Sequence, residues 1–272
     1  MAFIMGINRF RVLANIVVVA MSIVAAGCTG QRFTPPDVRV PTPHAGFDYQ
    51  IGAAYRPPSG ATVVSRDYTA EPVAGLYNIC YVNAFQAQPG DEGDWGEDLL
   101  LHAGNGTVVV DPGWHEALLD LTTPDKRQRI AEVVNGWIDS CADKGFQGVE
   151  PDNFDSYTRS RNLLTADEAQ QYIRLLSAHA HDKGLAIAQK NTSELSGNRR
   201  RNGLDFAVAE ECAENDECGV YTDAFSDRVE VVEYTDDGLA QACSGFGDRL
   251  SIVERDKQVS APSDNEYVRK TC

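Results

Sequence analysis

The feature of this sequence that most constrains its fold is a repeated alternation between short apolar runs and longer helical stretches. The runs are rich in Val, Ile and aromatic residues, and two of the helical stretches end in Lys144-Gly145 and Lys183-Gly184. This alternation is typical of a parallel sheet with crossover helices. The eight runs are residues 47–52, 62–67, 78–85, 148–153, 186–191, 205–210, 229–234 and 250–255. Eight parallel strands predict a (β/α)8 barrel in a single domain.

Two long helices are expected within this alternation, over residues 124–144 and 165–183. Thr165 and Glu168 have the spacing of a capping box at the start of the second helix. A further apolar run at residues 107–110 follows the third strand, where we expect an extra hairpin or an inserted strand. The 272 residues are enough for one barrel, which takes roughly 250 residues.

The N-terminus has the pattern of a targeting segment. Arg9 and Arg11 precede an almost wholly apolar stretch at residues 12–26, which ends in small residues. The sequence at this end is typical of a bacterial lipoprotein processing site, which predicts a signal peptide over residues 1–27 and a lipid on Cys28. The alternatives are ordinary secretion and an uncleaved anchor.

A tether is expected next, over residues 28–46, because this stretch contains several Pro and Thr residues and no apolar period. The barrel domain is expected over residues 47–272. The protein is then exported and anchored through Cys28 to the outer face of a bacterial cell membrane, or, in the alternative, secreted.

Six cysteines remain when Cys28 is set aside, and an even number in an exported protein indicates disulfides. Six cysteines allow 15 pairings, and spacing alone does not choose among them. A zinc site is not favoured, because only Cys212 and Cys218 lie close together and no His stands beside them. We expect no metal and no cofactor.

The formal net charge of −16 argues against a nucleic-acid partner, which would require a basic face. The acidic charge is compatible with a cationic substrate such as an amino-sugar polymer. The alternative is that the charge only keeps the surface soluble.

Charged residues gather where the expected strands end. In a (β/α)8 barrel these ends form one mouth, and active sites lie there. The positions include Asp67, Asp152, Asp155, Glu210 and Glu233. Like charges brought together raise one another's pKa, which suits a general acid beside an ionised carboxylate, as in glycoside cleavage. Taken singly, each of these charges is better explained as a solvated loop charge, but the whole set together favours a site.

Two blocks of sequence carry a family resemblance: residues 150–153 (Glu-Pro-Asp-Asn) and residues 206–212 (Phe-Ala-Val-Ala-Glu-Glu-Cys). With them the sequence resembles glycoside hydrolase family 114, whose known members are (β/α)8 barrels that cleave α-1,4-linked polygalactosamine. Supporting matches lie at residues 47–50, 66–67, 75–83, 144–149, 184–185, 190–191 and 232–234. The resemblance runs from about residue 47 to the C-terminus.

The resemblance implies that Asp152 is the catalytic nucleophile, that Glu210 is the acid/base and that Lys190 lies beside them. This sequence has Ala209 where the family usually has Asn, and Glu211 where it often has Gln. The first departure bears on the substrate, and the second on the choice between adjacent carboxylates. Strand alternation places the two on different faces, and Glu210 is preferred.

We therefore expect an endo-acting, retaining glycoside hydrolase, with carboxyl groups about 5 to 5.5 Å apart rather than about 6.5 to 9.5 Å. Lys190 is expected to pair with Asp152 or to stabilise the barrel mouth as a structural ion pair. Further expected substrate contacts are Asp67, Tyr49, Tyr81, Asp155, Tyr157, Lys190 and Glu233. The favoured disulfides are Cys212–Cys218, which would brace the loop carrying Glu210, then Cys243–Cys272 and Cys80–Cys141.

Other functions are less consistent with the sequence. A non-catalytic carbohydrate-binding lipoprotein on the same scaffold is the main alternative, and the presence of both Asp152 and Glu210 argues against it. A metal-dependent deacetylase needs clustered His and Asp ligands, and none of the five His residues ends an expected core strand. There is no G-x-S-x-G motif for a serine nucleophile.

Overall fold

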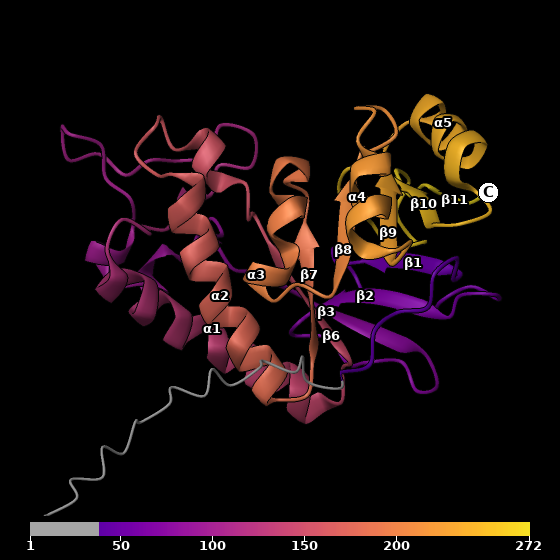
Figure 1. The fold of residues 1–272 in the computed structure, drawn as a ribbon, viewed down its shortest axis with the longest axis horizontal. Helices are drawn as coiled ribbons and strands as arrows, with labels where there is room; N and C mark the ends of the chain where they lie inside the picture. Colours follow the sequence, from indigo (N-terminus) through magenta and orange to yellow (C-terminus); the bar gives the residue numbers. More distant parts are fainter. Residues whose placement is uncertain (1–37) are drawn as a thin grey trace, which may run out of the picture. The chain divides into compact units, whose positions relative to one another are not determined.

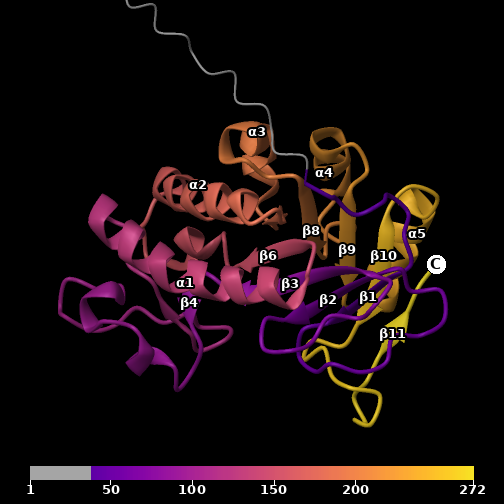
Figure 2. The ribbon, with the colours of Figure 1, turned by 90° about the horizontal axis from the view of Figure 1, so that it is seen from below.

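The computed structural model describes residues 38–272, and its main feature is a curled sheet of parallel strands in chain order (Figures 1 and 2). Each strand pairs with the next, and the last packs beside the first, so the sheet closes on itself. The strands are β1 (Phe47–Gln50), β2 (Val63–Asp67), β3 (Tyr77–Asn83), β6 (Gly148–Asp152), β7 (Ala186–Lys190), β8 (Phe206–Glu210), β9 (Val229–Glu233) and β10 (Ser251–Arg255). The predicted (β/α)8 barrel is confirmed, and each expected run overlaps one strand.

The helices all follow β3, and within residues 38–272 no helix connects β1 to β2 or β2 to β3. The α-helices are α1 (Pro124–Lys144), α2 (Ala166–Asp182), α3 (Arg199–Asn202), α4 (Cys218–Phe225) and α5 (Asp236–Phe246). The 3-10 helices are η1 (Glu92–Asp94), η2 (Glu97–Leu99), η3 (Ser156–Arg159) and η4 (Ser193–Asn198). Helices α1 and α2 pack side by side against the same part of the barrel (Figures 1 and 2).

The ends of the long helices follow local signals in the sequence. The Thr123 side chain accepts a hydrogen bond from Lys126 N at the start of α1. Gly145 ends this helix with φ of 91°, a left-handed conformation that favours glycine. Helix α2 begins with the predicted capping box of Thr165 and Glu168.

A long antiparallel excursion, residues 84–123, separates β3 from α1. It contains β4 (Gln86–Ala87) paired with β5 (Ala117–Leu118), and isolated bridges join Leu100 to Leu119 and Val110 to Ala117. The extra run expected at residues 107–110 lies in this excursion, which stands beside the barrel (Figure 2). At the other end of the chain, β11 (Arg269–Lys270) pairs antiparallel with β10.

Alternate residues of each strand face the barrel interior and the surrounding helices. On β8, Phe206 and Val208 belong to the interior cluster of buried side chains, whereas Ala207 and Ala209 belong to the cluster under the helices. Glu210 continues the interior series. This alternation therefore directs the Glu210 side chain to the mouth of the barrel.

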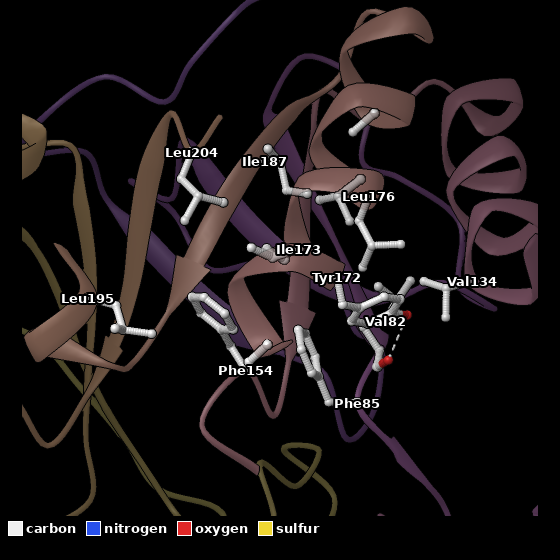
Figure 3. Close-up of a cluster of buried hydrophobic side chains, with 14 of the residues drawn as sticks. Val82, Phe85, Val134, Phe154, Tyr172, Ile173, Leu176, Ile187, Leu195 and Leu204 are labelled. Carbon is white, nitrogen blue, oxygen red and sulfur yellow. Dashed lines mark hydrogen bonds between the residues drawn. The ribbon is translucent and has the colours of Figure 1, made fainter. Parts of the chain in front are cut away.

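The cluster under the helices is shown in part in Figure 3, where aromatic rings fill the space between α2 and the sheet. The ring of Phe85 lies edge-on to Tyr172, with centroids 4.9 Å apart, and is tilted against Phe154 at 5.5 Å. The hydroxyl of Tyr172 donates a hydrogen bond of 2.9 Å to Ala84 O. This packing fixes α2, and with it the loop that follows β6.

Three disulfides tie the described chain together, and they are the three pairs favoured from the sequence. They are Cys80–Cys141, Cys212–Cys218 and Cys243–Cys272. The first joins β3 to α1, the second brackets the loop after β8, and the third joins α5 to the C-terminus.

The expected signal peptide (residues 1–27) and the expected lipid site, Cys28, lie outside the described residues. Residues 28–37, the first part of the tether expected over residues 28–46, also lie outside the described residues. Its described part packs on the barrel: Val38 and Val40 contact the interior cluster, and Arg39 O accepts a hydrogen bond from Tyr77. Within residues 38–272 no helix is both long and apolar enough to cross a membrane.

Candidate active site

A cleft of about 620 Å³ opens at the C-terminal ends of the strands. Five of the residues predicted from the sequence line it: Asp67, Tyr81, Asp152, Asp155 and Glu210. The remaining walls come from loops after β1, β7, β9 and β10 and from the excursion. The cleft thus lies where a (β/α)8 barrel places its active site.

A buried lysine lies beneath this cleft and contacts three carboxylates. Lys190, the last residue of β7, is only 1% exposed. Its Nζ lies 3.0 Å from Glu150 Oε1, 3.1 Å from Asp152 Oδ1 and 3.4 Å from Glu210 Oε2. Glu150 and Asp152 are two residues apart on β6, so alternation directs both side chains inward. Because β6 and β8 flank β7 in the sheet, their carboxylates meet at one ammonium group.

The charges around Lys190 favour the ionised forms of Lys190 and Asp152. Burial lowers the pKa of Lys190, but the opposing Asp152 and Glu210 carboxylates raise it well above its ordinary value. Burial raises the pKa of Asp152, but Lys190 and a 2.7 Å hydrogen bond from the Tyr81 hydroxyl hold it below its ordinary value. Glu150 lies deeper, and burial raises its pKa. Asp152 is therefore held ionised where it reaches the cleft.

The contacts to Lys190 also limit the distance between Asp152 and Glu210. Asp152 Oδ1 and Glu210 Oε2 lie 3.1 Å and 3.4 Å from the same Nζ atom. These two oxygens are therefore no further apart than the sum of the distances, about 6.5 Å.

Glu210 is held from both sides. Asn191 Nδ2 donates a hydrogen bond of 3.0 Å to Glu210 Oε2, and Asn191 Oδ1 accepts one of 2.9 Å from Glu210 N. The hydroxyl of Tyr234 donates a hydrogen bond to the other carboxylate oxygen, Oε1. These contacts orient the carboxyl group toward the cleft, which Asn191 and Tyr234 also line.

The adjacent carboxylate, Glu211, has a different environment. Its backbone has a positive φ of 54°, and its Oε1 lies 2.7 Å from Lys257 Nζ. Glu211 does not line the cleft, whereas Lys257 does, and Lys257 also lies over the Tyr234 ring. This arrangement supports the choice of Glu210 over Glu211 as the inward carboxylate.

Four residues expected to contact substrate do not line the cleft. Lys190 and Tyr49 are buried beneath it, and the Tyr49 hydroxyl donates a 2.7 Å hydrogen bond to Glu150 Oε1. The Tyr157 hydroxyl donates to Glu194 instead. Glu233 faces outward, because alternation on β9 turns Val232 and Tyr234 inward; its Oε1 accepts a 2.9 Å hydrogen bond from Ala213 N.

Several cleft residues were not predicted from the sequence. Tyr234 follows Glu233 by one position. Beneath the cleft, Glu150 precedes Asp152 by two positions, so strand alternation indicates that both side chains face inward. Trp114 and Glu116 come from the irregular excursion, where no periodicity indicates which side chains face the cleft. Asn191 follows Lys190 directly, and its residue type gives no signal.

Within the described chain, the group of side chains that could together hold a metal ion is Cys212, Cys218 and Glu233. The two cysteines form a disulfide, so neither sulfur is available as a thiolate ligand.

Comparison with known proteins links this geometry to a family. Residues 29–272 match the model of glycoside-hydrolase family GH114. Ega3 from Aspergillus fumigatus, solved in complex with galactosamine, is similar in structure with a TM-score of 0.70 and 21% identity, covering 85% of this chain and 96% of that one. The glycoside hydrolase domain of PelA from Pseudomonas aeruginosa has a TM-score of 0.56 and 14% identity, covering 85% and 100%. No curated protein matches the sequence.

Proposed function

The chain belongs to glycoside-hydrolase family GH114 and is a glycoside hydrolase, and we propose that it cleaves α-1,4-linked galactosamine polymers with Asp152 as nucleophile and Glu210 as acid/base. The observation that carries this proposal is the convergence of both carboxylates on Lys190 at the floor of the cleft. The net charge of −16 and the acidic cleft suit a cationic amino-sugar polymer. The similar protein Ega3 was solved with galactosamine, which supports the same substrate class here.

In the proposed reaction, Asp152 attacks the anomeric carbon while Glu210 gives its proton to the departing glycosidic oxygen. The sugar is then bonded to Asp152, and Glu210, now a carboxylate, takes a proton from the water that releases it. The lowered pKa of Asp152 keeps the attacking group ionised. Lys190 balances the charge, and it holds the Asp152 oxygen in place while the covalent bond forms.

The spacing of the two carboxylates supports a retaining mechanism. Retaining enzymes have carboxyl groups about 5 to 5.5 Å apart, whereas inverting enzymes need about 6.5 to 9.5 Å to admit a water molecule. The upper limit of about 6.5 Å between Asp152 Oδ1 and Glu210 Oε2 leaves little room for that water.

The test is release of reducing ends from a partly de-N-acetylated α-1,4-galactosamine polymer by the purified full-length protein. Asp152→Asn and Glu210→Gln are expected to lower the rate by roughly 100- to 10,000-fold. Glu211→Gln is the matched control, because it removes the neighbouring carboxylate and is expected to keep the wild-type rate. Cleavage by a folded Asp152→Asn variant at the wild-type rate would reject the assigned nucleophile.

The same reaction tests stereochemistry and mode of cleavage. NMR of the first product is expected to show the α-anomer, and a β-anomer would reject retention. An endo-acting enzyme releases a broad range of oligosaccharides early, whereas an exo-acting one releases a single short product. If a folded wild-type protein binds the polymer without cleaving it, the non-catalytic binding function replaces this proposal.

We also propose that the exported protein is anchored through a lipid on Cys28. The three disulfides are typical of an exported protein, and they occupy the other six cysteines. Mass spectrometry of the mature N-terminal peptide is expected to show a lipid-modified Cys28, and Cys28→Ser is expected to move the protein from the membrane fraction to the medium. An unmodified, cleaved N-terminus in the wild type would indicate ordinary secretion.

A further inference from the structure

One wall of the cleft comes from a part of the chain to which the mechanism above gives no role. The excursion contributes Asp111, Pro112, Gly113, Trp114 and Glu116 to the lining. The excursion is not part of the barrel, so barrel closure does not require these side chains to lie over the active site. The barrel fold therefore does not account for the position of these side chains over the active site.

Trp114 is 53% exposed, whereas Trp95 and Trp137 pack against each other between the excursion and α1. A large apolar ring left in water forgoes the stabilisation that its burial would give. The backbone beneath the ring is nevertheless well held: Gly113 N and Trp114 N donate hydrogen bonds of 2.7 Å and 3.3 Å to Asp111 Oδ1. The exposed ring is therefore presented by a braced turn.

Two further features fix this turn. His115 has a positive φ of 60°, a conformation uncommon for residues other than glycine and often found at functional sites. Arg159 Nε lies 2.5 Å from Asp111 Oδ2, and Arg159 Nη2 donates a 3.1 Å hydrogen bond to Asn153 Oδ1. Since Asn153 follows Asp152, this chain of contacts ties the Trp114 turn to the nucleophile.

Glu116 is the cleft carboxylate best placed to receive a cation. Asp152 and Glu210 contact Lys190, and Asp111 and Asp155 contact Arg159. Glu116, by contrast, contacts no basic side chain within residues 38–272.

The polar partners of Glu116 are neutral. Asn153 Nδ2 donates a 3.2 Å hydrogen bond to Glu116 Oε2. Burial, followed by the nearby Asp152 charge, raises the pKa of Glu116 to about 7 despite a lowering contact with Asn83. Asp67 also lines the cleft and forms no ion pair within residues 38–272, but it is turned toward its own loop, where Thr69 N donates a 2.9 Å hydrogen bond to it.

We propose that Trp114 and Glu116 form a binding subsite for an amino-sugar unit next to the unit that Asp152 attacks. Trp114 stacks against the apolar face of that sugar ring, and Glu116 accepts a hydrogen bond from its ammonium group. This inference rests on the proposed function and adds the element that selects de-N-acetylated units. An N-acetyl group at this position has no positive charge to pair with Glu116.

The subsite is tested by steady-state kinetics of the full-length protein on α-1,4-galactosamine polymers with low and high N-acetylation. Trp114→Ala is expected to raise KM about 10-fold on the low-acetylation polymer with kcat within about 2-fold, because stacking is remote from the bonds that change. Trp114→Phe is expected to recover much of the affinity. Glu116→Gln is expected to raise KM about 10-fold on the low-acetylation polymer and less than about 2-fold on the other.

Two matched controls come from the same excursion and do not line the cleft. Val110→Ala removes an exposed apolar side chain, and Glu97→Gln removes an exposed negative charge. Both are expected to keep wild-type kinetics.

Binding is measured separately from turnover by the intrinsic fluorescence of the Asp152→Asn variant on addition of short galactosamine oligosaccharides. The signal change is expected to disappear when Trp114→Phe is added.

The outcomes separate the two proposals. No cleavage of any galactosamine polymer by folded wild-type protein rejects the proposed function. Cleavage with unchanged KM in both Trp114→Ala and Glu116→Gln rejects the subsite alone. A fall in kcat without a rise in KM in Glu116→Gln rejects Glu116 as a binding residue, because its role would then lie in the chemical step.

Discussion

Buried carboxyl groups at the two ends of the barrel interior are stabilised in different ways. At the mouth, Lys190 lies within 3.4 Å of three carboxylates. Near the other end, Glu230, the second residue of β9, is completely buried and forms no ion pair among the described residues, and a contact with Ser251 offsets only part of the effect of burial. Burial raises the pKa of Glu230 to about 8.

The contrast shows two solutions to one physical problem. An ionised group removed from water is stable only if it is paired, and otherwise it takes up or loses a proton. Glu230 keeps its proton at neutral pH and behaves as a neutral side chain. At the mouth the charges are kept and balanced, which is what a nucleophilic carboxylate beside an acid/base requires.

The largest effect is expected for Lys190→Met, which leaves Glu150, Asp152 and Glu210 without their shared cation. We expect a loss of about 3–5 kcal/mol in the free energy of unfolding at pH 7, since breaking a buried pair exposes an uncompensated charge. We also expect kcat/KM to fall by roughly 100-fold or more. Urea unfolding and reducing-end assays measure the two effects.

A double variant sharpens this prediction. Adding Glu150→Gln to Lys190→Met removes one unpaired buried charge, and part of the lost stability is expected to return, although the lost activity is not. Stability that falls further in the double variant would contradict the charge-balance interpretation.

Tyr234→Phe tests whether the mouth also depends on orientation. The variant removes the hydrogen bond to Glu210 Oε1 and keeps the ring under Lys257. Because removing one partner of a buried hydrogen bond costs about 1–3 kcal/mol, kcat/KM is expected to fall roughly 10- to 100-fold. The midpoint of unfolding serves as the control and is expected to move little. A wild-type pH–rate profile with unchanged rate would exclude this orienting role.

Glu230→Gln tests the opposite end. Its pKa is about 8 in the folded chain and about 4.5 when unperturbed, so the folded state holds a proton that the unfolded state loses. Stability contributed by this proton is fully present below pH about 4.5 and is lost as pH rises through about 8. Glu230→Gln is therefore expected to be more stable than wild type at pH 8 by about 1–2 kcal/mol. Equal stability at pH 5 and pH 8 relative to wild type would contradict this.

The smallest effect is expected for Glu233→Gln, which tests the assignment of faces on β9. Glu233 lies outside the barrel wall, and a glutamine still accepts the hydrogen bond from Ala213 N. We expect kcat/KM to stay within about 2-fold of wild type, because the variant changes no group that lines the cleft. A loss as large as that of Tyr234→Phe would return Glu233 to the list of substrate contacts.

The sequence predicted much of the barrel because strand and helix patterns are local. All eight strands were found within two residues of their observed ends, and Thr165 and Gly145 mark helix ends as predicted. The same local rule placed Asp152 and Glu210 among the charged residues at the strand ends, and the family resemblance selected these two. At β9 the prediction was one residue too early in the chain: Glu233 was predicted to contact the substrate, but the next residue, Tyr234, faces the cleft.

By itself, the sequence therefore determined which segments form the barrel and which carboxylates end its strands, since hydrophobic periodicity and capping depend on residues close together in the chain. Only the tertiary structure decided that Glu150, Asp152 and Glu210 meet on Lys190, because the pairing of β6, β7 and β8 as neighbours places the ends of these strands side by side. It also decided that Trp114 and Glu116 reach the cleft, through an excursion that has no periodicity and is held by Arg159. Contacts between distant segments depend on how the whole chain packs, and no local pattern in the sequence predicts them.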